Sequence, residues 1–252
     1  MESIQVLSDP LALARAAIDQ FVHRAQEAIQ ARGRFSVALA GGSTPEPVYA
    51  GLAQPEIQTK LAWNDIHFFF GDERYVLPDH PDSNFRMVQE ALFSKVDVPE
   101  MNVHRVRTEL NAGLAAFDYE TRLKAFFLSP WPRFDLVLLG MGSDGHTASL
   151  FPHSFALNET CRWFVAHQLP SQSFWRLTLT KNAINAARQI VVLVSGESKA
   201  HMLAEVFSGA YAPEQKPIQM ISPQDGDLLW LLDEAAASQL SDKWIRRTSP
   251  RN

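Results

Sequence analysis

The sequence of 252 residues predicts an α/β protein with a mostly parallel sheet covered by helices on both faces. Two patterns indicate this class. Short, almost wholly apolar runs recur along the chain, as in strands that are buried on both sides. Between them lie segments with apolar residues at steps of three and four, as in helices that bury one face. No linker rich in Pro, Gly or Ser interrupts this alternation, so we expect a single domain over residues 1–252.

The N-terminal half begins with a helix. Asp9 followed by Pro10 is typical of an N-cap and a first helical residue, and the apolar period after them ends near Gly33. Gly41 opens a turn that leads into another helix, and the stretch 71–84, rich in Pro and Asp, is typical of a loop. The remaining apolar patterns of this half predict strands over 34–40 and 65–70 and helices over 84–94 and 111–128.

The C-terminal half continues the alternation with shorter elements. Apolar runs predict strands over 134–140, 163–167, 174–180 and 189–195. Helical patterns predict one turn over 182–187 and a helix over 196–209, and residues 228–240 predict a strand followed by a helix.

Composition limits the classes of function. Hydrophobic residues make up 46% and charged residues 20% of the chain, which is ordinary for a globular protein. A net charge of −5 argues against a nucleic-acid partner, although a few Arg and Lys side chains can still hold a small anion in a cleft. No apolar run reaches the length of a membrane span, and the N-terminus lacks the pattern of a signal peptide. The single Cys161 excludes a disulfide framework, so we expect a cytoplasmic protein that acts on a small molecule, as a monomer or a small homo-oligomer.

Glycine and polar residues follow four of the predicted strands. In an open α/β sheet, ligands bind beyond the carboxyl ends of the strands. One such loop would mean little, but four of them suggest a single site assembled from all. The candidate residues in chain order are Gly41, Gly42, Ser43, Thr44, Asp72, Arg74, Gly142, Asp144, His146 and Lys199.

The first two loops each have two interpretations. The segment "GGSTP" brings backbone N–H groups to the start of a helix, which favours an anion, but the same residues can simply cap that helix. It is not a P-loop, because the Walker spacing is absent. In "GDER", Asp72 and Arg74 either pair on a solvated turn or point into the crevice, since a buried strand leads directly into them.

The third loop, in "LLGMGSDGHTASLFP", carries the main candidate for proton transfer. Histidine titrates near neutral pH, and a nearby carboxylate fixes its tautomer and raises its basicity, so His146 with Asp144 suits general acid–base chemistry. Direct contact between these two side chains is not required at this spacing. The alternatives are a loop histidine that caps the next helix and a metal ligand, but no HExxH pattern or His pair at helical spacing occurs.

Two cations complete the candidate site. Arg176 lies in an otherwise apolar strand, where it must either face water at an edge or pair with an anion. Lys199 is expected on the first turn of the helix after the strand 189–195, where an ordinary solvent-exposed lysine is the simpler interpretation. Together with Ser43, the two cations would suit a phosphate group.

These motifs resemble the 6-phosphogluconolactonase family. The resemblance spans nearly the whole chain in order, through "VALAGGSTP", "FFFGDERYVLPDHPDSN", "LVLLGMGSDGHTASLFP", "RLTLTKNAINAARQIVVLVSGESKA" and "GDLLWLLDEAAA". The related glucosamine-6-phosphate deaminases share the Asp-Gly-His turn but continue with Asn-Glu-Pro, whereas Thr147 to Pro152 here read "TASLFP". Lys181 stands where the family often has a proline, and we expect this difference to affect only the local turn.

The resemblance implies a Rossmann-like α/β sheet similar to that of the glucosamine-6-phosphate deaminase and ribose-5-phosphate isomerase group. It implies hydrolysis of 6-phospho-D-glucono-1,5-lactone to 6-phospho-D-gluconate, the second step of the pentose phosphate pathway, without a metal or an organic cofactor. By this resemblance His146 is the expected general base, and the 6-phosphate is expected on Ser43, Arg176 and Lys199. The oxyanion donor stays open between Arg74 and the backbone N–H groups of Gly41 and Gly42. By the same resemblance, Asp72 and Asp144 are expected to orient neighbouring groups, and Thr44 and Gly142 are expected to contact the substrate.

Three alternatives stay open, one to the mechanism and two to the function. A nucleophilic serine, Ser43 or Ser149, is disfavoured because no GxSxG motif is present. A deaminase or an aldose–ketose isomerase on the same fold is disfavoured by the residues that follow His146. A non-catalytic sugar-phosphate sensor with a DNA-binding module is disfavoured, because a single helix precedes the first predicted strand and the chain is acidic.

Overall fold

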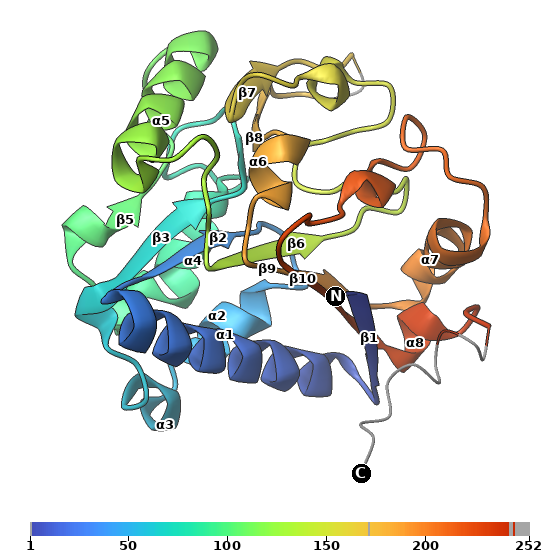
Figure 1. The fold of residues 1–252 in the computed structure, drawn as a ribbon, viewed down its shortest axis with the longest axis horizontal. Helices are drawn as coiled ribbons and strands as arrows, with labels where there is room; N and C mark the ends of the chain where they lie inside the picture. The colour runs from blue at the N-terminus through green and yellow to red at the C-terminus, as the bar shows by residue number, and fades with distance from the viewer. Residues whose placement is uncertain (1, 171, 242–243, 245–252) are drawn as a thin grey trace.

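The centre of the molecule is a seven-stranded sheet in which neighbouring strands run parallel. Figure 1 shows the computed structural model, which describes residues 2–170, 172–241 and 244. In spatial order the strands are β1 (Glu2–Leu7), β10 (Asp227–Asp233), β9 (Gln189–Val194), β6 (Leu136–Gly140), β2 (Phe35–Leu39), β3 (Ile66–Phe70) and β5 (Val103–His104). The prediction of a mostly parallel sheet is confirmed.

Helices cover both faces of this sheet, as predicted (Figure 1). The α-helices are α1 (Pro10–Arg32), α2 (Glu46–Leu52), α3 (Pro55–Gln58), α4 (Asn84–Ala91), α5 (Ala112–Phe127), α6 (Lys181–Asn185), α7 (Ala200–Ser208) and α8 (Glu234–Ala237). Short 3₁₀ turns lie at Trp63–Asp65, Phe93–Lys95, Glu100–Asn102, Phe155–Asn158, Glu197–Lys199 and Pro217–Met220. Among the described helices, none is long and apolar enough to cross a membrane.

The longest helix begins and ends where the sequence predicts. The carboxylate of Asp9 accepts a hydrogen bond from the backbone N–H of Ala12 at 2.8 Å, so it caps α1, and Pro10 is the first helical residue. Gly33 closes the helix with a φ of 72°, a left-handed conformation that glycine adopts without strain. Local sequence alone therefore specifies both ends of α1.

The strands of the large sheet send alternate side chains to two separate hydrophobic layers. In β6, Leu136 and Leu138 pack in the layer that contains α1, α2 and α4. Val137 and Leu139 pack in the other layer, with α5, α6, α7 and α8. Because both faces are covered, central strands such as β6 and β9 are apolar along nearly their whole length, and this pattern made them recognisable in the sequence.

A second, three-stranded antiparallel sheet consists of β4 (Asp72–Arg74), β8 (Arg176–Leu179) and β7 (Phe164–His167), in the order β4-β8-β7. This sheet corrects the prediction of a loop over 71–84, because the first residues of that stretch form β4. Three residues, all of them charged, carry no apolar pattern, so the partner strand β8 specifies β4. The short edge strands β1 and β5 also escaped prediction; in β1, Ile4 alone is buried.

The strand order of the large sheet reverses between β6 and β2. From β2 the chain moves outward through β3 to β5, and from β6 it moves the opposite way through β9 to β10. The loops that leave the carboxyl ends of β2 and β6 therefore diverge, and a crevice forms between them. The four loops that carry the candidate residues follow β2, β3, β6 and β9, which are four adjacent strands.

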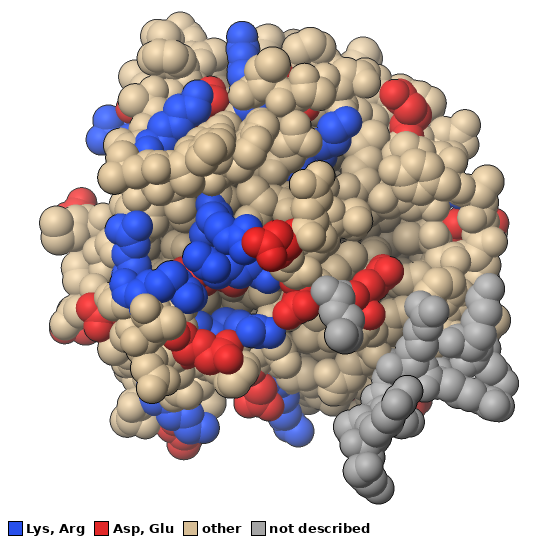
Figure 2. Space-filling view, in the orientation of Figure 1, with Lys and Arg blue, Asp and Glu red and all other residues tan. Residues whose placement is uncertain are grey.

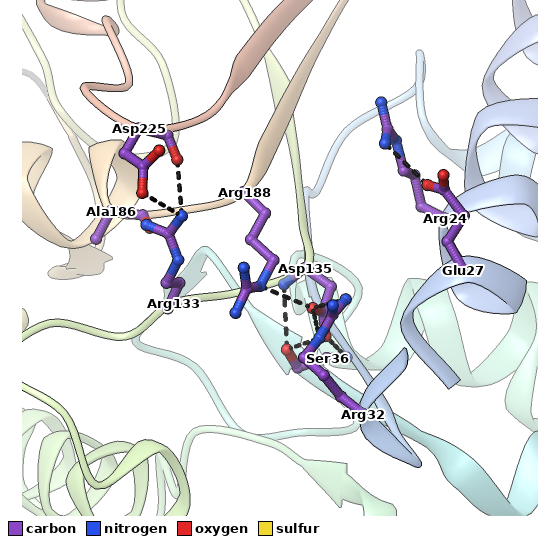
Figure 3. Close-up of polar contacts among 9 residues, drawn as sticks. All are labelled: Arg24, Glu27, Arg32, Ser36, Arg133, Asp135, Ala186, Arg188 and Asp225. Atoms are coloured by element: carbon purple, nitrogen blue, oxygen red, sulfur yellow. Dashed lines mark hydrogen bonds and ion pairs between the residues drawn. The ribbon is translucent and has the colours of Figure 1, made fainter. Parts of the chain in front are cut away.

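The amino ends of three of these strands, β2, β6 and β9, lie at the opposite edge of the sheet and are connected through one buried carboxylate. Figure 2 shows Lys and Arg side chains gathered beside α1, with acidic side chains among them. The buried carboxylate of Asp135 accepts a hydrogen bond from the backbone N–H of Ser36 at 2.8 Å (Figure 3). The same carboxylate pairs with Arg32 at 2.7 Å and with Arg188 at 3.4 Å. Asp135 thus ties the end of α1 to the starts of β2, β6 and β9.

Asp135→Ala should lower the free energy of unfolding by about 2–3 kcal/mol, because the buried N–H of Ser36 loses a charged acceptor. Urea denaturation measures this loss. Asp225→Ala is the matched control, since the Asp225 side chain is 88% exposed and pairs with Arg133 at the surface. The control should lose less than about 1 kcal/mol. Equal losses in the two variants would contradict the structural role of Asp135.

Candidate functional site

A cleft of about 310 Å³ lies at the carboxyl ends of β2, β3, β6 and β9. It is lined by residues from all four loops and from β8, so the structure brings together segments that are far apart in the sequence. The predicted residues that line it are Gly41, Gly42, Ser43, Thr44, Asp72, Arg74, Gly142, His146, Arg176 and Lys199. Asp144 does not line the cleft, but it contacts His146 directly.

The imidazole of His146 and the carboxylate of Asp144 form a hydrogen-bonded pair. Nδ1 of His146 lies 2.5 Å from Oδ1 of Asp144, and the backbone N–H of His146 donates to the same oxygen at 3.1 Å. Burial raises the pKa of Asp144, but the hydrogen bond and charge of His146 outweigh it, and the net result is a lowered pKa. Asp144 therefore stays ionised at neutral pH and engages Nδ1, which leaves Nε2 as the nitrogen that can accept a proton.

Gly142 gives this pair the space that it occupies. A Cβ atom at position 142 would lie 2.1 Å from Nδ1 of His146 and 2.6 Å from Oδ1 of Asp144. Gly145, inside the same turn, has a φ of 79° and so adopts a left-handed conformation. These two glycines explain why the turn that carries the imidazole is rich in glycine.

Arg74 and Arg176 lie directly opposite each other in the antiparallel pair of β4 and β8. Directly opposed residues have their side chains on the same face, so two positive charges meet at the cleft. Burial and then the charge of Arg74 lower the pKa of Arg176. Among the residues that the structure describes, neither guanidinium has a carboxylate within ion-pair distance, and Nε of Arg176 has no hydrogen-bond partner. Such a pair is suited to an anion with two negative charges.

The imidazole and one of the two arginines, Arg176, approach the same aromatic ring. His146 stacks on Phe151 with a centroid distance of 4.2 Å, and Cζ of Arg176 lies 5.5 Å from the centroid of Phe151. The separation of imidazole and guanidinium therefore cannot exceed these two distances together. A sugar phosphate can span such a gap, with its reacting carbon at one end and its phosphate at the other.

Asp72 is buried inside the site and connects three segments. Its side chain accepts hydrogen bonds from Oγ of Ser149 at 2.7 Å and from Nδ2 of Asn84 at 3.2 Å. It is 7% exposed, which excludes the interpretation of "GDER" as a solvated turn. Ser149 is itself fully buried and donates its hydroxyl proton to Asp72, so it is not placed to attack a substrate.

The "GGSTP" segment differs in detail from the prediction. The helix α2 begins only at Glu46, its N-cap is Pro45, and no side chain caps it, so Ser43 and Thr44 neither start nor cap the helix. The backbone of Gly42 has a φ of 101°, and among the described residues the N–H groups of Gly41 and Gly42 make no hydrogen bond to the protein. These amides remain available to an anionic atom in the cleft.

Lys199 lies in a 3₁₀ turn, Glu197–Lys199, and not on the first turn of α7 as predicted. Gly196, with a φ of 94°, separates β9 from this turn, so the α-helix begins one turn later. Lys199 still lines the cleft.

Of the polar and aromatic side chains that line the cleft, three were missed from the sequence: Asn84, Phe151 and Gln172. Oε1 of Gln172 accepts a hydrogen bond from Arg176 at 2.6 Å, and Asn84 packs against the backbone of Gly41. Gln172 lies in the connection between β7 and β8, and no motif marks it. Within the described part of the chain, no three His, Cys, Asp or Glu side chains are close enough together to hold a metal ion.

The fold and the cleft define a class of protein: an α/β protein with an imidazole–carboxylate pair and a cationic end in one cleft at a sheet switch point. Residues 8–230 fit the model of a family described as glucosamine-6-phosphate isomerases/6-phosphogluconolactonase. The chain belongs to this family.

Curated relatives and solved structures support this membership. A 6-phosphogluconolactonase of Nostoc sp. is 43% identical over 95% of this chain and 99% of its own length. One from Synechocystis sp. is 44% identical over 94% of this chain and 98% of its own length. The structure of 6-phosphogluconolactonase from Trypanosoma cruzi superposes with a TM-score of 0.85 at 30% identity, over 96% of this chain and 97% of that one. A monomeric glucosamine-6-phosphate deaminase, at 21% identity and a TM-score of 0.79, shares the fold.

Gly41→Ala should lower the free energy of unfolding by about 1–3 kcal/mol, because overpacking displaces a buried amide. The new Cβ atom would lie 1.9 Å from Oδ1 of Asn84, whose amide also donates to Asp72. Urea denaturation measures the change. Gly140→Ala, in the same cleft but with no atom within 4 Å of the added Cβ, should stay within about 0.5 kcal/mol of the wild-type protein. An unchanged stability of Gly41→Ala would show that Asn84 is not held against the Gly41 turn.

Proposed function

We propose that this protein hydrolyses 6-phospho-D-glucono-1,5-lactone to 6-phospho-D-gluconate, the second step in the oxidative branch of the pentose phosphate pathway. The observation that carries the proposal is one cleft lined by His146, which pairs with Asp144, and by both arginines, with His146 and Arg176 beside the ring of Phe151. The names of the relatives, which cover nearly the whole chain, support the same substrate. We place the reaction in the cytoplasm, where the exposed Cys161 stays reduced.

His146 is the general base of this mechanism. Asp144 holds Nδ1, so Nε2 takes a proton from a water molecule, and the water oxygen attacks C1 of the lactone. The resulting imidazolium is stabilised by the ionised Asp144 and returns the proton to the ring oxygen when the C1–O5 bond breaks. Atoms balance, since one water is consumed and the product is the open-chain acid. The steps use only side chains, backbone amides and water.

The cationic end of the cleft holds the 6-phosphate. Arg176 and Arg74 face each other across two strands with donors that have no carboxylate partner among the described residues, which suits a phosphate dianion. Lys199 and Ser43 line the same cleft and add to the positive and hydrogen-bonding character of the site. Binding energy from this remote group fixes C1 relative to the water and the imidazole, and so lowers the barrier to the reaction.

The developing oxyanion at C1 needs its own donors. We assign Arg74 to the phosphate together with Arg176, because the two residues are directly opposed in β4 and β8, and this favours the backbone amides as the oxyanion donors. The N–H groups of Gly41 and Gly42 lack protein acceptors among the described residues, and the φ of 101° at Gly42 belongs to a turn that only glycine adopts easily. We assign oxyanion stabilisation to these two amides.

A direct test of the proposed function is an assay with freshly made 6-phosphogluconolactone, corrected for its spontaneous hydrolysis. We expect turnover far above the uncatalysed rate and no release of ammonia from glucosamine 6-phosphate. Ammonia release without lactone turnover would identify a deaminase on the same fold. Binding of the lactone without turnover would support a non-catalytic sensor.

His146→Ala should lower kcat by about 10²–10⁴-fold, the usual contribution of a positioned general base. His23→Ala is the matched control, because the His23 side chain is 61% exposed on α1, outside the residues that line the cleft. The control should keep wild-type turnover. Near-normal kcat in His146→Ala would remove His146 from the role of base.

Arg176→Ala should mainly raise KM for the phosphorylated lactone, since it removes half of the arginine pair. Activity on unphosphorylated gluconolactone should change much less, because that substrate has no phosphate to hold. Arg162→Ala, at a side chain that is 67% exposed, is the matched control and should leave both activities unchanged. Equal losses on the two lactones would show that Arg176 does something other than bind phosphate.

A further inference from the structure

Glu73 is a buried carboxylate between two residues of the site, and the mechanism above leaves it without a role. It is 2% exposed, in the middle of β4. Its Oε1 accepts hydrogen bonds from the backbone N–H of Arg74 and of Asn84, both at 2.8 Å. Its Oε2 accepts from the backbone N–H of Phe85 at 2.9 Å and faces Oγ of Ser83 at 3.4 Å. One side chain thus engages the backbone on both sides of the loop 75–82.

These contacts place Glu73 at the first turn of α4. Its carboxylate satisfies two of the N–H groups that a helix leaves unpaired at its start, and Oγ of Ser83 accepts from a third, that of Arg86, at 3.2 Å. A negative charge at this end of a helix is favourable. The helix is therefore anchored to β4 through Glu73, and β4 in turn is fixed to β8.

The anchored residues line the cleft directly. Arg74 provides one of the two arginines, and its Nη1 donates to the backbone oxygen of Asp82 at 2.8 Å, at the far end of the same loop. Asn84 packs against the Gly41 turn and donates to the backbone oxygen of Asp72 at 2.9 Å. Without the Glu73 contacts, Arg74 on one side of the cleft and Asn84, which packs against the Gly41 turn, on the other would no longer be held in position.

We propose that Glu73 is a positioning residue for the lactone reaction, holding the backbone of Arg74 and Asn84 so that the arginine pair and the Gly41–Gly42 amides keep their mutual geometry. This inference rests on the proposed function for its effect on turnover. The anchoring contacts themselves are independent of any substrate.

The ionised form of Glu73 is the form that fits these contacts. Three of its hydrogen-bond partners are backbone N–H groups, which can only donate and so cannot accept a hydrogen bond from a protonated carboxyl. The Ser83 hydroxyl is the one contact that can accept such a bond. Burial raises the pKa of Glu73 to about 7, against the lowering effect of the three backbone donors. The carboxyl therefore takes up a proton near neutral pH, and its hydrogen bonds with the three N–H groups are then no longer charge-assisted.

The charged and titratable groups around Glu73 lie on its own strand, on β8 and on α5. On β4 they are Asp72, whose charge raises the pKa of Glu73, and Arg74, whose backbone N–H donates to it. Arg176 on β8 and the phenol of Tyr119 on α5 interact with Glu73 electrostatically, and its contacts from the start of α4 are neutral donors. The fixed positive charges of the two arginines keep their sign through the neutral range, so they do not create the expected pH dependence.

The test is the pH dependence of kcat/KM in the wild-type protein and in Glu73→Gln. A general base with an imidazole side chain by itself makes kcat/KM fall at low pH with the slope of a single protonation. With Glu73 as a second group, the wild-type limb below about pH 7 should be steeper than a one-proton limb. Glu73→Gln should lower kcat/KM at pH 8 by at least about 10-fold and should show a one-proton limb only. Glu90→Gln removes an exposed carboxylate from the same helix and should match the wild-type protein in both respects.

Backbone amide exchange separates this inference from the proposed function. In the wild-type protein without substrate, the amides of Asn84 and Phe85 should be protected from exchange, because both donate to the Glu73 carboxylate. In Glu73→Gln this protection should be clearly lower. If the wild-type protein fails to hydrolyse the lactone but shows this exchange pattern, the proposed function is wrong and the anchor stands.

Two results would overturn the role of Glu73. One is a folded Glu73→Gln protein with wild-type kcat/KM and an unchanged limb. The other is free exchange of the Asn84 and Phe85 amides in the folded wild-type protein, which would show that the anchor does not exist. The second measurement needs no variant, so it decides the matter even if Glu73→Gln does not fold.

Discussion

The reversal of strand order between β6 and β2 is the constraint on which the site depends. Parallel strands end at the same edge of the sheet, and at the reversal their loops diverge, so a cleft forms there without a cavity in the core. The loops after four adjacent strands meet around this cleft and supply Gly41, Arg74, His146 and Lys199. The opposite edge of the sheet is closed by the contacts of Asp135, which hold the strand starts together. The contacts that stabilise the sheet thus lie at one of its edges, and the candidate site lies at the other.

The small antiparallel sheet adds what the large sheet cannot supply. It places two arginines in direct opposition at the cleft, where their like charges repel each other. Buried carboxylates connect this sheet to the rest of the site: Asp72 to the loop that carries His146, and Glu73 to the start of α4. A strand of three charged residues thus carries both an arginine that lines the cleft and the carboxylates that connect the strand to its surroundings.

Much of this structure was accessible from the sequence because its signals are local. The fully apolar strands of a doubly covered sheet, the Asp9 cap and the left-handed Gly33 all follow from short-range chemistry. The site residues could be predicted because loops at carboxyl ends of parallel strands must meet. Contacts specified by distant partners could not be predicted: β4 depends on β8, and Asn84 is recognisable only once it lies against Gly41. The order of the strands, and with it the place of the cleft, is likewise a long-range property.

The central claim is that one sugar phosphate spans the cleft, with its reacting carbon at the imidazole and its phosphate at the arginine pair. A crystal structure of the complex with 6-phosphogluconate tests this claim most directly. The account predicts the phosphate in contact with Arg74 and Arg176, and the C1 carboxylate within hydrogen-bond distance of Nε2 of His146 and of the amides of Gly41 and Gly42. A product bound in the reverse orientation, or one that leaves His146 without contact to C1, would contradict it.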